Sequence, residues 1–481
     1  MKNRPNILII YTDQQRYDTI RALGADWMHT PNLDRLCAEG TAYTQATTPS
    51  PVCMPARWSL HTGQWPGTHR CYSNHHCGPV PGWSLPGLLR EGGYRTGLVG
   101  KNHSFLDAGD LDVFDTSPEP GDHPAVAARR AELRKPEYVR LFPKGAPGGL
   151  EGDPEIYKTE AAIRFIEESA GRRGVGSGTT KPWFLWLSYL NPHTPYVTPE
   201  EFLSLYEGRD IPGPVVEPDG LEAAGKPFRH RFHLQNNDVV MPCDRDTTMQ
   251  MRRVYYGMIS LIDREVGRLL EALDRTGQRE NTFIIFTSDH GDYMGDHGLN
   301  TKSPALYDCL VRVPFIVSHP GQLAEGRECG DFVSHTDILP AVAAVAGVDV
   351  PAGVQGRNFL MATGKNLRPA AFSEYGIPGR PYDEWSVKQA GYDGRRFTNP
   401  GNPHLPWEGN PVSLSGRIRM VRTDSWKYVE EPEGTNELYD LDNDPNELEN
   451  VYGITGTETV LEQMHRLMKN LTTQCQMDAR H

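Results

Sequence analysis

Cysteine is scarce in this chain, and long apolar runs are missing from it. Eight cysteines among 481 residues are too few and too scattered for a disulfide framework. No apolar run has the length of a membrane span, and residues 1–5 lead into an apolar strand without the apolar core of a signal peptide. We therefore predict a cytoplasmic protein that does not insert into a membrane.

Positive charge is also in short supply. The 49 lysines and arginines are outnumbered by 62 aspartates and glutamates, which gives a net charge of -13. This balance argues against nucleic acid and anionic membranes as the main partners. An acidic protein that handles an anionic substrate has to gather its positive charges locally, so clusters of Lys, Arg and His are the most informative.

The chain does contain four apolar strands that end in polar, reactive residues. They are predicted at residues 6–11, 97–100, 183–190 and 283–286, and their continuous apolar character is typical of strands buried on both faces. The residues that follow them include Asp13 and Gln14, Lys101 and His103, His193, and Asp289 and His290. A water-facing loop or a helix N-cap explains any one of these cases. Four together favour one site, because ligands of open α/β sheets bind outside the carboxyl ends of the strands.

The pattern between these strands predicts the fold class. Helices are predicted at residues 31–40 and 249–275, the second from apolar side chains at helical spacing. Strands that alternate with helices predict an α/β fold with a large, mainly parallel sheet flanked by helices on both faces. Length alone allows two or three domains of about 150 residues each.

The character of the chain changes near residue 365. Short strands are predicted at 370–374, 419–422, 426–429 and 437–441, followed by an amphipathic helix around 460–471. We predict a catalytic domain at 1–365 and a small α+β domain with an antiparallel sheet at 366–481. Irregular segments are predicted at 107–154, 171–181, 206–244 and 377–415, and the last of these is expected to shape the substrate pocket.

Residues 53–57 read Cys-Met-Pro-Ala-Arg, and Leu60-His61-Thr62-Gly63 follows shortly after. A buried structural thiol is the common fate of such a cysteine, and an ordinary cysteine hydrolase would need Cys53 as a thiol beside a histidine. Asp13 and Asp289 supply the carboxylate oxygens that hard divalent cations prefer. Cys71 and Cys77 flank His75 and His76, but their spacing matches no zinc ligand pattern, so no structural zinc is predicted.

Taken together, these stretches resemble the formylglycine-dependent sulfatases of the alkaline phosphatase superfamily along nearly the whole chain. The resemblance rests on residues 6–14, the Cys53 run, Gly100 to His103, Pro192 to Tyr196, Ser288 to Gly291, Gly295 to Lys302 and Glu437 to Pro445. It implies an alkaline-phosphatase-like fold. It also implies that Cys53 is oxidised to formylglycine, whose hydrate attacks sulfur with one hydroxyl and expels sulfate with the other.

The resemblance also implies a role for each site residue. The cation ligands are Asp13, Gln14, Cys53, Asp289 and His290, and Ca²⁺ is the expected ion. Arg57 and Lys101 steady the hydrate, and Asp289 accepts its proton. Lys302 binds sulfate oxygens, His193 protonates the leaving alcohol, and His103 takes the proton of the second hydroxyl. Imidazole suits such duties because it titrates near neutral pH.

The chain departs from the common sulfatase pattern in its cation ligands and at Ala56, where Ser is usual. Gln14 and His290 replace an Asp and an Asn, and the nitrogen ligand leaves Mg²⁺ or Mn²⁺ open. Choline sulfatases and phosphonate monoester hydrolases share this pair. A phosphonate or phosphate ester hydrolase with the same nucleophile is therefore the alternative function. A noncatalytic carbohydrate-binding relative would be expected to have lost these residues.

The predicted reaction is the hydrolysis of an O-sulfate monoester, with a small sulfated carbohydrate as the expected substrate. Asn74, His76 and His297 are candidate substrate-binding residues, and His75, residues 229–231 and Trp407 are candidate pocket walls. The expected protein partner is a formylglycine-generating enzyme or an anaerobic sulfatase-maturating enzyme. A homo-oligomer is possible on this sequence.

Overall fold

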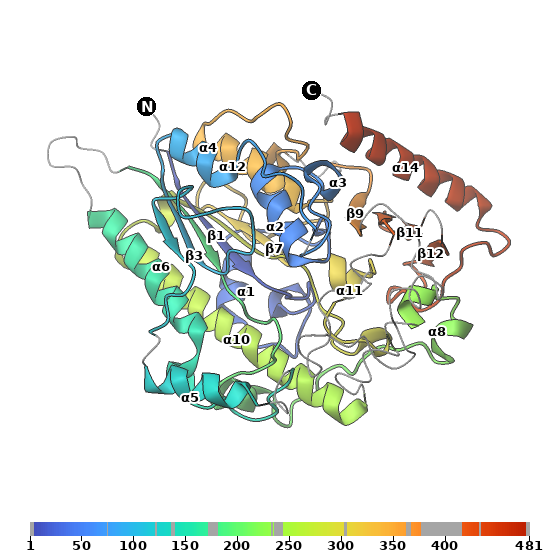
Figure 1. Cartoon of the computed structure of the whole chain (residues 1–481), viewed down its shortest axis with the longest axis horizontal. Coiled ribbons are helices and arrows are strands. Elements are labelled where there is room, and N and C mark those ends of the chain that lie inside the picture. The colour runs from blue at the N-terminus through green and yellow to red at the C-terminus, as the bar shows by residue number, and fades with distance from the viewer. Residues whose placement is uncertain are drawn as a thin grey trace.

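The structure is a computed structural model of the whole chain. It describes residues 4–477 except 75, 121–122, 136–139, 172–180, 232–233, 235–243, 303–304, 362–366, 377–415 and 432–433. A large sheet with helices on both faces occupies most of the molecule, and a smaller sheet lies beside it under the last helix (Figure 1). No helix within these described residues is long and apolar enough to cross a membrane.

The large sheet has eight strands in the order β4-β3-β5-β1-β6-β7-β2-β8. In chain order the strands are β1 (Asn6–Thr12), β2 (Thr41–Tyr43), β3 (Arg95–Gly100), β4 (Val113–Asp115), β5 (Trp183–Ser188), β6 (Thr282–Ser288), β7 (Phe315–Ser318) and β8 (Arg327–Cys329). The five from β4 to β6 pair in parallel, whereas β7 runs antiparallel to both of its neighbours. This confirms the predicted mainly parallel sheet.

The strands are apolar throughout because both faces of the sheet are covered. In β1, Ile7 and Ile9 pack into one core cluster and Leu8 and Ile10 into the other. The first face carries α2 (Cys53–Thr62), α4 (Leu85–Glu91) and α12 (Ile338–Ala346); the second carries α1 (Pro31–Ala38), α6 (Pro154–Gly171) and α10 (Arg245–Arg275) (Figure 1). Burial on two sides removes the polar alternation of a half-exposed strand.

The remaining helices are short or peripheral. They are α3 (Pro66–His69), α5 (Pro124–Leu133), α7 (Glu200–Leu203), α8 (Gly220–Ala223), α11 (Asp308–Val311) and α14 (Glu458–Met477). Single 3₁₀ turns lie at Arg21–Leu23, Leu150–Gly152, Ser204–Tyr206, Arg279–Asn281, Asp296–Gly298, His335–Asp337 and Phe359–Met361. The predicted helices at 31–40 and 249–275 correspond to α1 and α10.

The smaller sheet is antiparallel, in the order β12-β11-β10-β9. Its strands are β9 (Ala371–Tyr375), β10 (Ile418–Arg422), β11 (Trp426–Glu430) and β12 (Glu437–Asp440). Helix α14 packs Met464, Met468 and Leu471 onto this sheet. The buried Asp308 carboxylate of α11 forms ion pairs with Arg422 of β10 and Lys427 of β11. These ion pairs connect the small sheet to α11.

Two predicted irregular segments contain regular structure. Residues 107–154 include β4 and α5, and residues 206–244 include α8. Helix α5 buries only Val126 and Arg129, so its sequence lacks the apolar stripe that identifies a helix. The segment 377–415, with Trp407, lies outside the described residues.

Candidate active site

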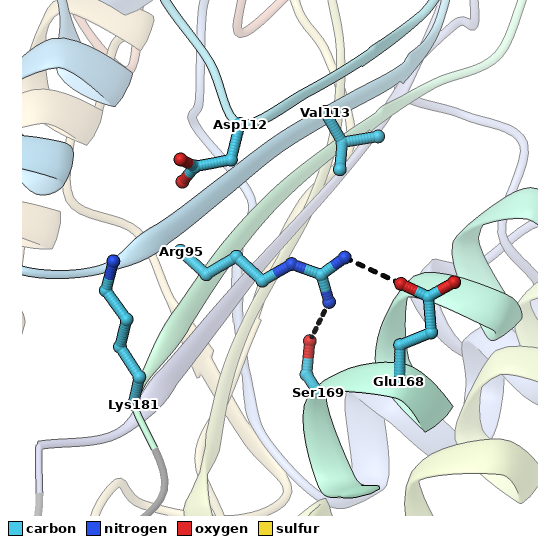
Figure 2. Close-up of a pocket in the computed structure, with 6 residues that line it drawn as sticks. All are labelled: Arg95, Asp112, Val113, Glu168, Ser169 and Lys181. Carbon is cyan, nitrogen blue, oxygen red and sulfur yellow. Dashed lines mark hydrogen bonds and ion pairs between the residues drawn. The ribbon is translucent and has the colours of Figure 1, made fainter. Parts of the chain in front are cut away.

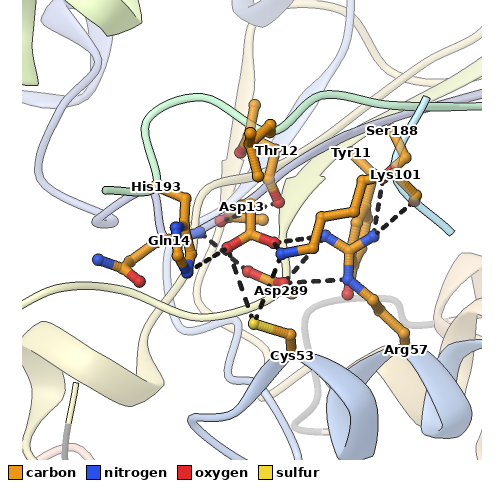
Figure 3. Close-up of polar contacts among 12 residues, drawn as sticks. Tyr11, Thr12, Asp13, Gln14, Cys53, Arg57, Lys101, Ser188, His193 and Asp289 are labelled. Atoms are coloured by element: carbon orange, nitrogen blue, oxygen red, sulfur yellow. Dashed lines mark hydrogen bonds and ion pairs between the residues drawn. The ribbon is translucent and has the colours of Figure 1, made fainter. Parts of the chain in front are cut away.

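The polar residues after β3, β5, β1 and β6 converge at one edge of the large sheet. Asp13 and Gln14 follow β1, Asp289 follows β6, Lys101 follows β3 and His193 lies in the loop after β5. These four strands are neighbours in the sheet and run in parallel, so their carboxyl ends share one edge. Figure 3 shows the side chains of Asp13, Lys101, His193 and Asp289 turned toward one another above the start of α2. The sequence predicted this convergence.

Helix α2 adds Cys53 and Arg57 to the cluster. Cys53 is the first residue of the helix, and Arg57 lies one turn later on the same face. The Arg57 guanidinium donates to Asp13 Oδ2 at 2.9 Å and to Asp289 Oδ2 at 3.0 Å, and its Nη1 donates to Ser188 Oγ at 2.7 Å (Figure 3). One fully buried cation therefore bridges two fully buried carboxylates.

Aromatic rings complete the surroundings of Arg57. Its guanidinium carbon lies 5.1 Å from the ring centre of Tyr11 and 5.8 Å from that of Trp186. Rings at this distance stabilise a cation. Burial alone would lower the Arg57 pKa, but Asp289 and Asp13 raise it, so the charge is permanent. The contacts of Tyr11 and Ser188 were not predicted, although Ser188 is a polar residue at the end of an apolar run.

The Cys53 sulfur lies among positively charged groups. Its Sγ is 3.0 Å from Lys302 Nζ, 3.9 Å from Lys101 Nζ and 3.4 Å from His290 Nε2. Burial and Asp13 would raise the Cys53 pKa, but Lys101, Lys302 and His290 hold it well below its usual range. The amino end of α2 favours negative charge at the same place. An anionic group is therefore stabilised at this position.

Four of these side chains could hold a metal ion. One ligand atom from each of Asp13, Cys53, Asp289 and His290 lies within 4.8 Å of all the others. Burial would raise the Asp13 pKa, but Lys101, His193 and Arg57 hold it well below the usual range. Burial and Asp13 raise the Asp289 pKa to about 6. The two carboxyl groups thus differ in pKa: that of Asp13 is lowered and that of Asp289 is raised.

Gln14 is held in an unusual backbone conformation. Its φ of 72° lies in the left-handed region, which costs a non-glycine residue about 1–3 kcal/mol. Its backbone N–H donates to Asp289 Oδ1, and its side-chain Nε2 donates to Asp292 Oδ2 at 2.5 Å. Because Asp292 accepts the amide nitrogen, Gln14 Oε1 is left to face Lys302 Nζ at 3.2 Å. The sequence singled out Gln14 but did not predict the role of Asp292.

His193 borders the cluster. Its Nε2 lies 4.0 Å from Asp13 Oδ1, and its Nδ1 is 2.6 Å from the Thr194 carbonyl oxygen. A carbonyl only accepts, so the neutral ring carries its proton on Nδ1. Burial and Lys302 lower the His193 pKa to about 3.

His103 lies two residues after Lys101 and has a φ of 43°. Its Nδ1 is buried and has no hydrogen-bond partner within the described part of the chain. The structure therefore does not join His103 to the cluster through a hydrogen bond or an ion pair among described residues, and its predicted role stays a prediction.

The three candidate substrate residues lie in different settings. Asn74 Oδ1 accepts from the backbone N–H of Met54, next to Cys53. His76 is exposed and contacts Ser73. His297 is buried, with its Nδ1 2.6 Å from Glu217 and its ring stacked on Tyr307. Only Asn74 touches a neighbour of the nucleophile candidate in the described contacts.

Two further sequence features have structural partners. Cys71 and Cys77 form a disulfide that closes the loop carrying Asn74, a pairing the sequence did not predict. Arg229, a predicted pocket wall, is fully buried and forms ion pairs with Glu431, just after β11, and with Glu437 of β12. Arg229 thus connects the segment after α8 to the small sheet.

Another pocket lies away from this cluster. It has a volume of about 350 Å³ and lies at the amino ends of β3 and β5, the opposite edge of the sheet. Figure 2 shows Arg95 in this pocket, tied to Glu168 and Ser169 of α6, with Asp112 and Lys181 nearby. Because its arginine is already paired, this pocket does not reproduce the convergence of charges around Cys53.

A mainly parallel sheet with carboxylates, lysines and a cysteine at a helix start along its carboxyl edge is the arrangement expected of a hydrolase of the alkaline phosphatase superfamily. The sulfatase family model matches residues 5–348, and the chain belongs to the sulfatase family. It is therefore a sulfuric ester hydrolase.

Relatives of known sequence match over nearly the whole chain. The uncharacterized sulfatase YidJ of Escherichia coli is 29% identical over 96% of this chain and 86% of its own length. The multifunctional alkaline phosphatase superfamily protein PehA of Trinickia caryophylli is 30% identical, with coverages of 94% and 91%. The choline-sulfatase of Rhizobium meliloti is 29% identical, with coverages of 93% and 82%.

Solved structures share the fold. The phosphonate monoester hydrolase of Agrobacterium radiobacter superimposes with a TM-score of 0.77 at 24% identity, over 98% of this chain and 96% of that one. The protein BT4656, in complex with its substrate D-glucosamine-2-N,6-O-disulfate, superimposes with a TM-score of 0.73 at 20% identity, over 98% of both chains.

Proposed function

We propose that this enzyme hydrolyses O-sulfate monoesters of small molecules through the hydrate of a formylglycine made from Cys53. The observation that carries the proposal is the position of Cys53 Sγ, at the start of α2 and within 4 Å of Lys101, Lys302, His290 and Asp13. The same lysines that stabilise negative charge there would meet the nonbridging oxygens of a sulfate ester. The hydrate supplies two hydroxyls on one carbon, which a thiol does not.

The donor set fits a hard divalent cation. Two carboxylates and the Gln14 amide oxygen supply oxygen ligands, and His290 Nε2 adds one nitrogen. We propose Asp13, Gln14, Asp289, His290 and the modified Cys53 as its ligands, with Ca²⁺ as the expected ion and Mg²⁺ or Mn²⁺ as alternatives. The bound cation would neutralise charge on the sulfate oxygens.

The chain's own residues can move the protons that this reaction requires. The Asp289 carboxylate has an oxygen within 4.8 Å of Cys53 Sγ, so it is proposed to accept the proton of the attacking hydroxyl. His193 holds its neutral proton on Nδ1, so it can protonate the leaving alcohol from Nε2 only as an imidazolium. An anionic substrate beside the ring favours that charged form. His103 is proposed to take the proton of the second hydroxyl.

A phosphonate or phosphate ester hydrolase is the second candidate function. The pair of Gln14 and His290 in the cation site favours it, because phosphonate monoester hydrolases share this pair. PehA, at 30% identity, is named as a multifunctional member of the superfamily. Both ester classes present a tetrahedral oxyanion to the same lysines, so the two activities can coexist in one site.

The substrate alcohol and the cellular setting are also proposals. A small sulfated carbohydrate is the sequence-based expectation, and BT4656, a structural neighbour, was solved with a sulfated glucosamine. The maturation partner is proposed to be a formylglycine-generating or anaerobic sulfatase-maturating enzyme. The cytoplasmic location expected from the sequence stays a proposal.

The test is the mass of the peptide that carries Cys53, taken from protein produced with an active maturation enzyme. We expect an aldehyde at Cys53 in the wild type. Cys53→Ala should lose hydrolysis of sulfate and phosphonate esters alike, while Cys309→Ala, which removes another buried thiol, should retain it. An unmodified thiol in active protein would overturn the mechanism, and a higher kcat/KM for phosphonates than for sulfates would favour the second function.

A further inference from the structure

A cavity borders the cluster on the side of His193. It has a volume of about 150 Å³ and lies between α5, the start of α6 and the loop after β5. His193 lines this cavity and also reaches Asp13 with its Nε2 (Figure 3). A group in the cavity would therefore lie next to the residue proposed to protonate the leaving alcohol.

The walls of the cavity are largely apolar. They include Val126, Leu133, Leu190, Pro195 and Val197. Two arginines also line it, but each is paired with a carboxylate: Arg129 with Asp153 at 2.7 Å and Arg130 with Glu119 at 3.0 Å. These charges cancel in pairs, so the cavity is not built to bind a second anion.

One polar group in the lining has an unused hydrogen-bonding capacity. Asn191 is only 4% exposed, and its Nδ2 has no hydrogen-bond partner among the described residues. Its backbone is fixed, because its carbonyl accepts from Asp13 N at 3.3 Å and its N–H donates to Glu155. Its Nδ2 is itself shielded from the cavity, so it offers no hydrogen bond to a group that lies there.

We propose that this cavity binds the alcohol part of the ester and selects an apolar group about the size of one six-membered ring. An apolar cavity of about 150 Å³ is large enough for benzene. A sugar ring has a similar size, but its hydroxyls would lose water without gaining partners on these walls. The inference rests on the proposed function, and it replaces the expected carbohydrate with a less polar alcohol.

A matched pair of ring alcohols tests the binding separately from the reaction. Cyclohexanol and glucose both contain a six-membered ring, and their binding to the full-length protein can be followed by saturation-transfer NMR. We expect cyclohexanol to bind at least tenfold more tightly than glucose. Val126→Phe, which fills the cavity from α5, should abolish the cyclohexanol signal, whereas Val350→Phe at an exposed position should preserve it. Equal binding of the two alcohols would overturn the inference.

The esters of the same rings test the selection during catalysis. Cyclohexyl sulfate and glucose 3-sulfate are both secondary alkyl esters, so their leaving groups differ mainly in polarity. We expect kcat/KM to be at least tenfold higher for cyclohexyl sulfate than for glucose 3-sulfate, because its KM is lower. Val126→Phe should lose that preference. If Val126→Phe does not fold, Leu133→Ala enlarges the cavity instead and should improve kcat/KM for 2-naphthyl sulfate relative to phenyl sulfate.

The two levels of the proposal fail in different ways. If no ester is cleaved but cyclohexanol still binds and Val126→Phe abolishes that binding, the proposed function fails and the cavity assignment stands. If sulfate esters are cleaved and glucose 3-sulfate is preferred, the function stands and the cavity assignment fails.

Discussion

Asp292 fixes which end of the Gln14 amide faces Lys302. Its Oδ2 accepts both Gln14 Nε2 at 2.5 Å and the Tyr196 hydroxyl at 2.6 Å, and its Oδ1 accepts the Met294 N–H. A carboxylate can accept all three donors, whereas an amide at this position would direct its own N–H₂ group at one of them. Asp292 is thus a positioning residue for a proposed ligand.

Asp292→Asn should therefore weaken cation binding. Groups that orient metal ligands typically contribute 10–100-fold to affinity, so we expect a drop of at least tenfold in Ca²⁺ affinity by isothermal titration. Tyr196→Phe removes one donor but keeps the acceptor for Gln14, and its effect should be smaller. Unchanged affinity in Asp292→Asn would show that the Gln14 amide does not depend on this carboxylate.

Gly100 sets the distance between β3 and β5 beside Lys101. Its φ is 94°, and a Cβ added there would lie 2.1 Å from the Ser188 carbonyl oxygen. Gly24 has a similar φ of 102° but open space around it. We expect Gly24→Ala to lower the free energy of unfolding by about 1–2 kcal/mol through its backbone alone. Gly100→Ala should cost about 1–3 kcal/mol more from the steric clash and reduce activity. Equal denaturation midpoints would contradict this.

The Asp308 ion pairs, which connect α11 to the small sheet, should make the stability of the fold fall at acid pH. Burial would raise the Asp308 pKa, but Arg422 and Lys427 hold it well below its usual range. The pairs therefore stabilise the fold above the unfolded pKa of about 4 and lose their contribution as the pH falls through the folded pKa.

Asp308→Asn should cost about 3–5 kcal/mol at pH 7, because it leaves buried cations without their carboxylate. The difference from wild type should shrink below pH 4. Denaturant unfolding at pH 7, 5 and 3.5 measures it, with the exposed Asp442→Asn as a neutral control. A deficit that is constant with pH would show that the charge of Asp308 is not the source of the stability.

His61 should lower stability in mild acid. Its ring lies 4.3 Å from that of Trp186, and neither nitrogen has a hydrogen-bond partner among the described residues. Burial and Arg57 lower its pKa to about 3. The unfolded chain therefore binds a proton below pH 6.5 that the folded chain does not, and stability falls by about 2 kcal/mol between pH 7 and pH 5.

His61→Met should remove that part of the pH dependence while filling a similar volume. Thermal unfolding at pH 5 and pH 7 measures the effect. We expect the variant to be more stable than wild type at pH 5, and this difference in stability to be smaller at pH 7. His29→Gln, at an exposed histidine, should leave the slope unchanged. The same slope in His61→Met and wild type would place the titrating group elsewhere.

The cluster could be predicted because its geometry follows from local sequence. Apolar runs identify buried parallel strands, and parallel neighbours bring their ends to one edge, so Asp13, Lys101 and Asp289 were expected to meet. The partners of Arg229 could not be predicted in this way, because they lie more than 200 residues away in the sequence. The contact of His297 with Glu217 could not be predicted for a similar reason, since Glu217 comes from a segment without a regular pattern. Helix α5 was missed because it buries too few apolar residues to show a helical period.

The burial of Cys53 also limits when the proposed maturation can take place. Only 1% of this residue is exposed once α2 has packed against the sheet. If Cys53 is converted to formylglycine as proposed, an enzyme that must enclose the thiol would have no access after that point, so oxidation and folding would compete for the newly made chain. Under that proposal, a molecule that folds first would keep its thiol, and slower folding or earlier recruitment of the maturation enzyme would raise the active fraction of the population.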